Sequence, residues 1–143
     1  MNKYLSAESF VKNEPPISTE LPPGLKQKFK IDKSKKYKIT NVQFPKLIAA
    51  SAKYKSKYST LIEFQDEQGR KHDKTVLFGD KNRSDYIDHK VERIRDDFLK
   101  NIKMREDLAN PEFDPKFWEI FLLNNKETDF YIAFQLLRSK ILS

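Results

Sequence analysis

Apolar and polar residues alternate in the first half of the chain in a way that predicts β-strands. Four runs have the period-two pattern or the β-branched and aromatic composition of half-buried strands: 29–32, 36–42, 53–64 and 70–78. The last two runs flank five polar residues that end in Gly69, and this spacing predicts a β-hairpin. We expect an antiparallel sheet of roughly three to five strands within residues 29–78.

The hydrophobic period lengthens to that of an amphipathic helix after Gly79. Five apolar residues then recur at spacings of four, three, four and four, which places them on one helical face: Ile87, Val91, Ile94, Phe98 and Ile102. Asn82, Ser84 or Asp85 is the expected N-cap. The pattern predicts one continuous helix of about five turns.

Two further helices are predicted near the C-terminus. Pro115 occupies a favoured first-turn position ahead of the apolar run 117–123. Thr128 or Asp129 is the expected cap of the last helix, over residues 130–142. One apolar stripe of that helix contains Phe130, Phe134, Leu137 and Ile141.

These patterns predict an α+β fold, with a small antiparallel N-terminal sheet followed by three C-terminal helices. Residues 1–25 lack periodicity and contain four paired prolines, which favour an extended backbone: Pro15, Pro16, Pro22 and Pro23. We expect residues 1–25 to form an extended Pro-rich arm, with these prolines as candidate contacts to neighbouring subunits. Residues 26–143 are expected to form a single domain, with the sheet in 29–78 and the helices in 84–142.

Composition narrows the chemistry that the chain can perform. The 143 residues include no cysteine, which excludes disulfides, thiolate zinc sites and cysteine nucleophiles. No apolar run approaches the roughly 20 residues of a membrane-spanning helix. The N-terminus has neither a signal-peptide nor a transit pattern. We therefore expect a protein without a membrane span that is soluble inside cells or is carried within an assembly.

The net charge of +7 is concentrated in one block, because residues 26–57 contain eleven lysines and a single acidic residue, Asp32. Six lysines are candidate contacts to an anionic partner: Lys35, Lys36, Lys38, Lys53, Lys55 and Lys57. Three interpretations stay open, namely a solvated sheet face, a nucleic-acid surface and a surface for acidic proteins. Strand alternation would direct Lys and Tyr to opposite faces, which argues against a combined phosphate-binding and stacking platform.

The two histidines are the only imidazole groups available for catalysis or metal binding. His72 lies among charged residues, and we expect it to be exposed to solvent. His89 follows Asp85 by one helical turn, and we expect this pair to support the junction between sheet and helices. A nucleophile and a third ligand are missing nearby, so no catalytic residue, metal site or cofactor is predicted.

A series of short motifs runs in order between residues 75 and 128. The series is Thr75-Val-Leu-Phe-Gly79, Asp85-Tyr86, His89-Lys90, Arg93, Phe98-Leu99, Arg105-Glu-Asp107, Pro111, Phe117-Trp118, Leu122-Leu123, Asn125-Lys126 and Thr128. It resembles an uncharacterised family of small basic proteins encoded by large nucleocytoplasmic DNA viruses. The sequence departs from the family pattern at Asn101-Ile102, Leu108, Lys116, Asn124 and Glu127. The resemblance implies a viral, virion-associated protein that is not an enzyme, and it supplies no mechanism.

The aromatic residues of this stretch are expected to fix the helices onto the sheet. We expect a junction scaffold formed by Phe78, Gly79, Tyr86, His89, Phe98, Phe117 and Trp118. Contact with partners is then left to the lysine block and the N-terminal arm.

The leading functional hypothesis is a structural protein of a large DNA virus particle, assembled in the host cytoplasm. It would be a minor capsid or cement component that bridges neighbouring subunits, with the major capsid protein or other minor capsid proteins as partners. The alternative is a lysine-rich core protein that binds nucleic acid without sequence preference. A third option is a host-interaction protein that stays free in the cytoplasm.

Overall fold

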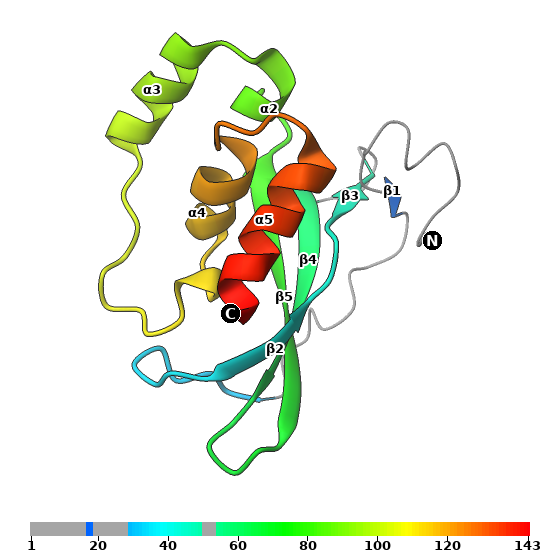
Figure 1. Cartoon of the computed structure of the whole chain (residues 1–143), viewed down its shortest axis with the longest axis vertical. Coiled ribbons are helices and arrows are strands. Elements are labelled where there is room, and N and C mark those ends of the chain that lie inside the picture. The colour runs from blue at the N-terminus through cyan, green and yellow to red at the C-terminus, as the bar shows by residue number, and fades with distance from the viewer. Residues whose placement is uncertain (1–16, 19–28, 50–53) are drawn as a thin grey trace.

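The computed structural model describes residues 17–18, 29–49 and 54–143 of the chain. An N-terminal sheet is followed by a helical half, which confirms the predicted α+β class (Figure 1). The predicted arm and its four prolines lie outside the described residues, apart from Ile17 and Ser18.

The sheet is built around one long central strand. Its members are β1 (Ile17–Ser18), β2 (Lys38–Val42), β3 (Lys46–Ile48), β4 (Ser56–Gln65) and β5 (Lys71–Asp80). β5 pairs antiparallel with β4 along its whole length, and β2 and β3 pair antiparallel with the other edge of β4. β1 adds a short parallel pairing to β3. The antiparallel sheet predicted within residues 29–78 is confirmed by β2 to β5, the last of which continues to Asp80. β1 lies outside the predicted range.

β4 and β5 form the predicted hairpin. The turn between them contains Gly69 at a φ of 79°. The Asp66 carboxylate accepts hydrogen bonds from the backbone N–H groups of Gln68 and Arg70, each at 2.9 Å. This local bonding explains why a polar pentapeptide ending in glycine closes the strands.

The strand predicted over residues 29–32 does not form. The Asp32 carboxylate instead accepts hydrogen bonds from the backbone N–H and the hydroxyl of Ser34, at 3.0 and 2.7 Å, and begins a turn. The Phe29 ring stacks on His72 with a centroid separation of 3.8 Å. Side-chain bonding within the turn therefore replaces the strand ladder that the alternating pattern predicted.

The helical half begins after β5. Its elements are α2 (Tyr86–His89), α3 (Glu92–Asn101), a 3₁₀ turn η1 (Pro111–Phe113), α4 (Pro115–Trp118), a π-helix η2 (Glu119–Leu123) and α5 (Phe130–Leu142). Asp114 caps α4, and Asp129 caps α5 as predicted. α4 and α5 pack beside the sheet, whereas α3 lies at one end of the molecule (Figure 1).

The first predicted helix is divided in two, which corrects the expectation of five continuous turns. Lys90 adopts left-handed backbone angles, with φ at 60°, and closes α2 through its N–H to the carbonyl of Tyr86. The next amide, that of Val91, donates to Nδ1 of His89 at 2.9 Å instead of continuing the helix. The predicted stripe is broken as a result. Ile87 is buried, whereas Val91 and Ile94 are 42% and 48% exposed.

One continuous apolar core joins the sheet to α4, η2 and α5. Trp118 is fully buried and stacks against Phe78 with centroids 5.7 Å apart. On α5, Phe130, Phe134 and Leu137 are buried, as the apolar stripe of that helix predicted. Arg138 of α5 also donates to the carbonyl of Val42 and the side-chain oxygen of Asn41, which anchors the helix to β2.

Two glycines with nearly the same left-handed backbone give a matched stability test. A Cβ at Gly79 would lie 3.2 Å from both Leu123 and Lys57, whereas nothing lies within 4 Å of a Cβ at Gly69. Gly69→Ala is expected to cost about 1–2 kcal/mol for the backbone alone. Gly79→Ala is expected to cost at least about 1 kcal/mol more, because packed atoms must also move. Urea denaturation measures both changes, and equal costs would contradict the tight packing at Gly79.

Candidate functional site

The predicted lysine contacts divide into exposed and internal groups. Lys35, Lys36, Lys38 and Lys55 are exposed, and Lys53 lies outside the described residues. Lys35 makes an ion pair with Glu67 at 3.1 Å, an exposed pair that contributes little to stability. Its hydrogen bond to Glu67 raises the pKa of Lys35 above its ordinary value.

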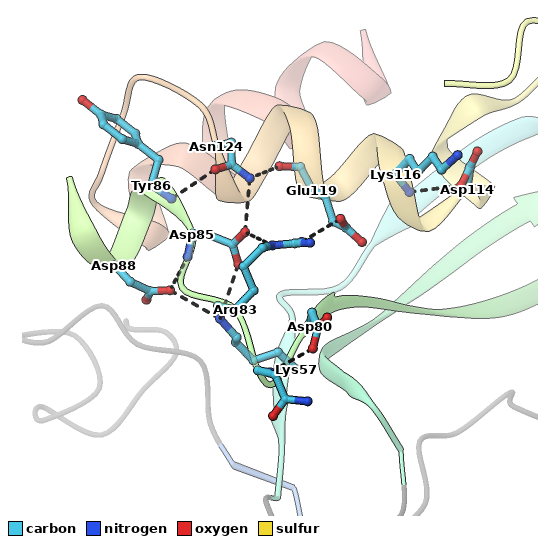
Figure 2. A network of polar contacts seen from close by, with 11 residues as sticks. Lys57, Asp80, Arg83, Asp85, Tyr86, Asp88, Asp114, Lys116, Glu119 and Asn124 are labelled. Atoms are coloured by element: carbon cyan, nitrogen blue, oxygen red, sulfur yellow. Dashed lines mark hydrogen bonds and ion pairs between the residues drawn. The ribbon is translucent and has the colours of Figure 1, made fainter. Parts of the chain in front are cut away.

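Lys57 belongs to the interior of the protein. Its ammonium group donates to the carbonyl of Arg83 at 2.7 Å and lies 3.3 Å from the buried carboxylate of Asp85 (Figure 2). Its side chain is only 17% exposed. The prediction that Lys57 contacts a partner is therefore replaced by a structural role, because its charge is already paired inside the fold.

Lys57 is part of a junction network that contains Lys57, Arg83, Asp85, Glu119 and Asn124. Asp85 is 1% exposed and accepts hydrogen bonds from Asn124, Arg83 and Lys57 (Figure 2). Arg83 continues to Glu119 at 2.8 Å. The network connects β4 and the start of α2 to η2. The ion pairs and hydrogen bonds of these charged groups therefore hold the helices to the sheet.

The predicted junction scaffold is only partly a buried core. Phe78, Phe117 and Trp118 are buried. Tyr86 and Phe98 are half-buried, and each ring lies under a guanidinium group, with Arg95 5.5 Å from Tyr86 and Arg83 4.8 Å from Phe98. These two rings therefore support α2 and α3 through cation–π contacts.

The two histidines differ from their predicted settings. The carboxylate of Asp85 bonds to Lys57, Arg83 and Asn124, so the expected side-chain pair with His89 does not form. His72 is half-buried, not solvent-exposed. It is held between the ring of Phe29 and the carboxylate of Asp66, to which its Nε2 donates at 2.9 Å.

Asp66 is an ion-pair centre at the tip of the hairpin. The hydrogen bond from His72 is the main reason that the pKa of Asp66 lies well below its usual range. Hydrogen bonds from the Arg70 backbone and side chain lower it further. The carboxylate thus holds the hairpin tip to the ring of His72, which stacks on Phe29. Phe29 lines the edge of a pocket.

This basic pocket, defined here by Phe29, Lys33, Lys74, Arg105 and Phe113, has a volume of about 510 Å³. Its walls come from the loop before β2, the loop before α4 and Lys74 of β5. Sequence patterns gave no sign that these distant loops meet.

The pocket walls are joined by buried hydrogen bonds. Asn110 is 3% exposed. Its side-chain oxygen accepts a hydrogen bond from the N–H of Tyr37 at 2.8 Å, and its side-chain NH₂ donates to the carbonyl of Tyr37 at 3.2 Å. The N–H of Ala109 donates to the carbonyl of Lys33 at 2.9 Å. The concave shape is therefore formed before any ligand binds.

Lys74 occupies the most unusual position in the pocket. The β4–β5 register pairs Lys74 with Ile62 and Val76 with Thr60, so Lys74 lies on the same sheet face as the buried Val76. Burial lowers the pKa of the Lys74 ammonium, and the nearby charge of Lys33 lowers it further. Among the residues that the structure describes, none hydrogen-bonds or ion-pairs with this ammonium.

The sequence already indicated that Lys74 faces the core, although Lys74 lies outside the lysine-rich block on which the charge analysis concentrated. Val76 and Phe78 mark the buried positions of β5, and the same alternation extends back through Lys74 to His72. A lysine at a core-facing position is a stronger indication of a binding site than any of the exposed lysines.

Comparisons of the chain with protein-family models, curated proteins and solved structures found no match. None of the helices described is long and apolar enough to cross a membrane. Within residues 17–18, 29–49 and 54–143, no group of three or more acidic or imidazole side chains is placed to hold a metal ion.

Proposed function

We propose that this protein is a non-enzymatic structural component of a large DNA virus particle that binds acidic surfaces of neighbouring capsid proteins. It would act as a minor capsid or cement protein. The observation that carries the binding part of the proposal is the basic pocket beside the exposed lysine segment, defined as Lys30, Lys33, Lys35, Lys36 and Lys38.

The charge balance of this region favours an anionic partner. Asp32 and Asp114 line the pocket, but each carboxylate is already used to accept backbone hydrogen bonds from a nearby turn or helix start. The two carboxylates keep their negative charges, but the lysine and arginine side chains that line the same pocket outnumber them. Attraction of this kind accelerates encounter and sets orientation.

The use of the histidines supports a non-enzymatic role. Nε2 of His72 is bonded to Asp66, and Nδ1 of His89 accepts from the backbone of Val91. Neither imidazole is paired with a hydroxyl nucleophile in the described contacts. The polar groups of the junction are likewise engaged in holding the fold together.

The particle setting rests on the resemblance at residues 75–128. Several of its motif residues build the buried junction: Phe78, Gly79, Asp85, Phe117, Trp118, Leu122 and Leu123. The basic pocket is lined mainly by residues before and between those motifs. The resemblance therefore supports a shared scaffold, whereas the acidic partner is inferred from charge.

Fractionation of purified particles tests the proposal. After the DNA-containing core is removed, the protein is expected to stay with the capsid shell. Recovery with the core DNA would favour the nucleic-acid alternative, and absence from particles would overturn the structural role.

The nucleic-acid alternative has its own electrostatic signature. It requires DNA affinity to fall steeply between low and physiological salt, since bound counterions are released on binding. Neutralising Lys36, Lys38 and Lys55 should then reduce that salt slope, because all three side chains are exposed. Lys57 should contribute nothing to it, since its ammonium is paired inside the fold.

A further inference from the structure

We infer that the basic pocket is a receptor for an acidic peptide segment with one aromatic or large apolar side chain between its carboxylates. This inference rests on the proposed binding of acidic protein neighbours and specifies how one such neighbour is held. It assigns the pocket a particular ligand chemistry, which general surface attraction does not require.

The cations of the pocket are not equivalent. Lys35 is paired with Glu67, and Arg105 is paired with Asp107. The side-chain ammonium groups of Lys30, Lys33 and Lys74 make no hydrogen bond or ion pair with any described residue. The free positive charge is therefore carried by ammonium groups, which bind carboxylates as point charges without the planar fork of a guanidinium.

Apolar side chains line the pocket between these cations. Phe29 and Phe113 belong to one aromatic cluster with Phe64, at centroid separations of 5.9 and 5.1 Å from it. Leu108 and Ile31 add aliphatic lining. A ligand with charged groups alone would leave these apolar surfaces in contact with water. A ligand with an apolar side chain would cover them and remove them from water.

The remaining polar lining decides between a peptide and a nucleotide. Asn110 is the one uncharged polar side chain among the described lining residues, and both ends of its amide are already bonded to the backbone of Tyr37. Reading the edge of a nucleic-acid base requires free donors and acceptors of that kind. Free ammonium groups beside apolar surface suit a carboxylate-rich peptide with an apolar anchor instead.

Fluorescence anisotropy with two labelled peptides tests the inference on the full chain. One peptide is Asp-Glu-Asp-Phe-Glu-Asp-Glu, and its matched control has Ser in place of Phe. At physiological salt, the Phe peptide is expected to bind about tenfold more tightly, because its ring becomes buried in the pocket.

Lys74→Met is the decisive variant. It removes the charge and keeps an unbranched apolar chain, so the fold should be at least as stable to heat as the wild type. Affinity for the Phe peptide is expected to fall about tenfold. The control Lys100→Met, at an exposed position on α3, should leave that affinity unchanged.

The outcomes separate this inference from the function on which it rests. Equal binding of the Phe and Ser peptides, or full binding by Lys74→Met, would overturn the pocket assignment and leave the charged surface intact as a general contact. If neither peptide binds, the proposed binding of acidic protein neighbours is itself wrong. Displacement of the Phe peptide by adenosine monophosphate or single-stranded DNA at similar concentrations would assign the pocket to nucleotides. It would contradict the inference that the ligand is a peptide.

Discussion

Replacing Asp85 with alanine is expected to destabilise the fold by about 3 kcal/mol, because the carboxylate is buried and balances two cations. Asp85 is 1% exposed and lies within 3.4 Å of both Lys57 and Arg83. Its removal leaves the 17% exposed Lys57 side chain with less compensation inside the protein. It also removes an acceptor from the buried amide of Asn124. Urea denaturation of the purified variant measures the loss.

Asp88→Ala provides the matched control for this prediction. Asp88 contacts the same ammonium of Lys57 at 3.4 Å, but its side chain is 43% exposed. Water screens that pair, and the carboxylate also accepts the Asp85 N–H at 3.1 Å in the capping box of α2. The expected cost is therefore about 1–2 kcal/mol, mostly from the lost cap and still below that of Asp85→Ala. Similar losses for the two variants would show that burial of Asp85 is not what makes the junction network important.

Trp118→Ala is expected to cost about 3–5 kcal/mol, which is the usual range for removing a large buried aromatic side chain. The indole is 0% exposed and contacts the rings of Phe78 and Phe117. Its Nε1 also donates to the carbonyl of Glu112 at 2.8 Å, and that acceptor would lose its partner. The loss is at least about a fifth of the roughly 5–15 kcal/mol that stabilises an ordinary domain, and for a domain of low stability it is most of it.

Phe121→Ala is the control for Trp118 in the next turn of the same helical segment. Phe121 is 41% exposed, although its ring contacts Phe117. Its truncation should cost clearly less, and the two variants together report where the core ends. A small loss at Trp118 would contradict the placement of α4 against β5.

Local signals predicted the elements that local bonding determines. The hairpin followed from two β-prone runs around a turn ending in Gly69, and Asp66 supplies the side-chain bonds that close it. α5 followed from a cap at Asp129 and an apolar stripe that begins at Phe130. In both cases the residues that define the element are neighbours in the sequence.

The errors arose where one side chain competed with the backbone. The apolar stripe through Val91 predicted continuous helix, but the imidazole of His89 accepts the Val91 amide, and the left-handed Lys90 ends α2. The alternating run at 29–32 predicted a strand, but Asp32 bonds to Ser34 and makes a turn. Periodicity contains no information on these hydrogen bonds.

The candidate site was predicted only as a charge distribution. Counting lysines identified the exposed Lys35, Lys36 and Lys38, but it also included Lys57, which pairs with the distant Asp85. The pocket itself depends on contacts between Tyr37 and Asn110, which are 73 residues apart in the chain. Only the tertiary structure brings such segments together.

Carbodiimide cross-linking of intact particles, followed by mass spectrometry, tests the proposed binding most directly. The reagent joins an ammonium to a carboxylate that lies against it, so it reports acidic protein neighbours and not nucleic acid. We predict isopeptide bonds from Lys33, Lys36, Lys38 or Lys74 to aspartate or glutamate residues of another particle protein. Lysines cross-linked to no other protein, together with ultraviolet cross-links from the same segment to DNA, would contradict the proposed acidic partner.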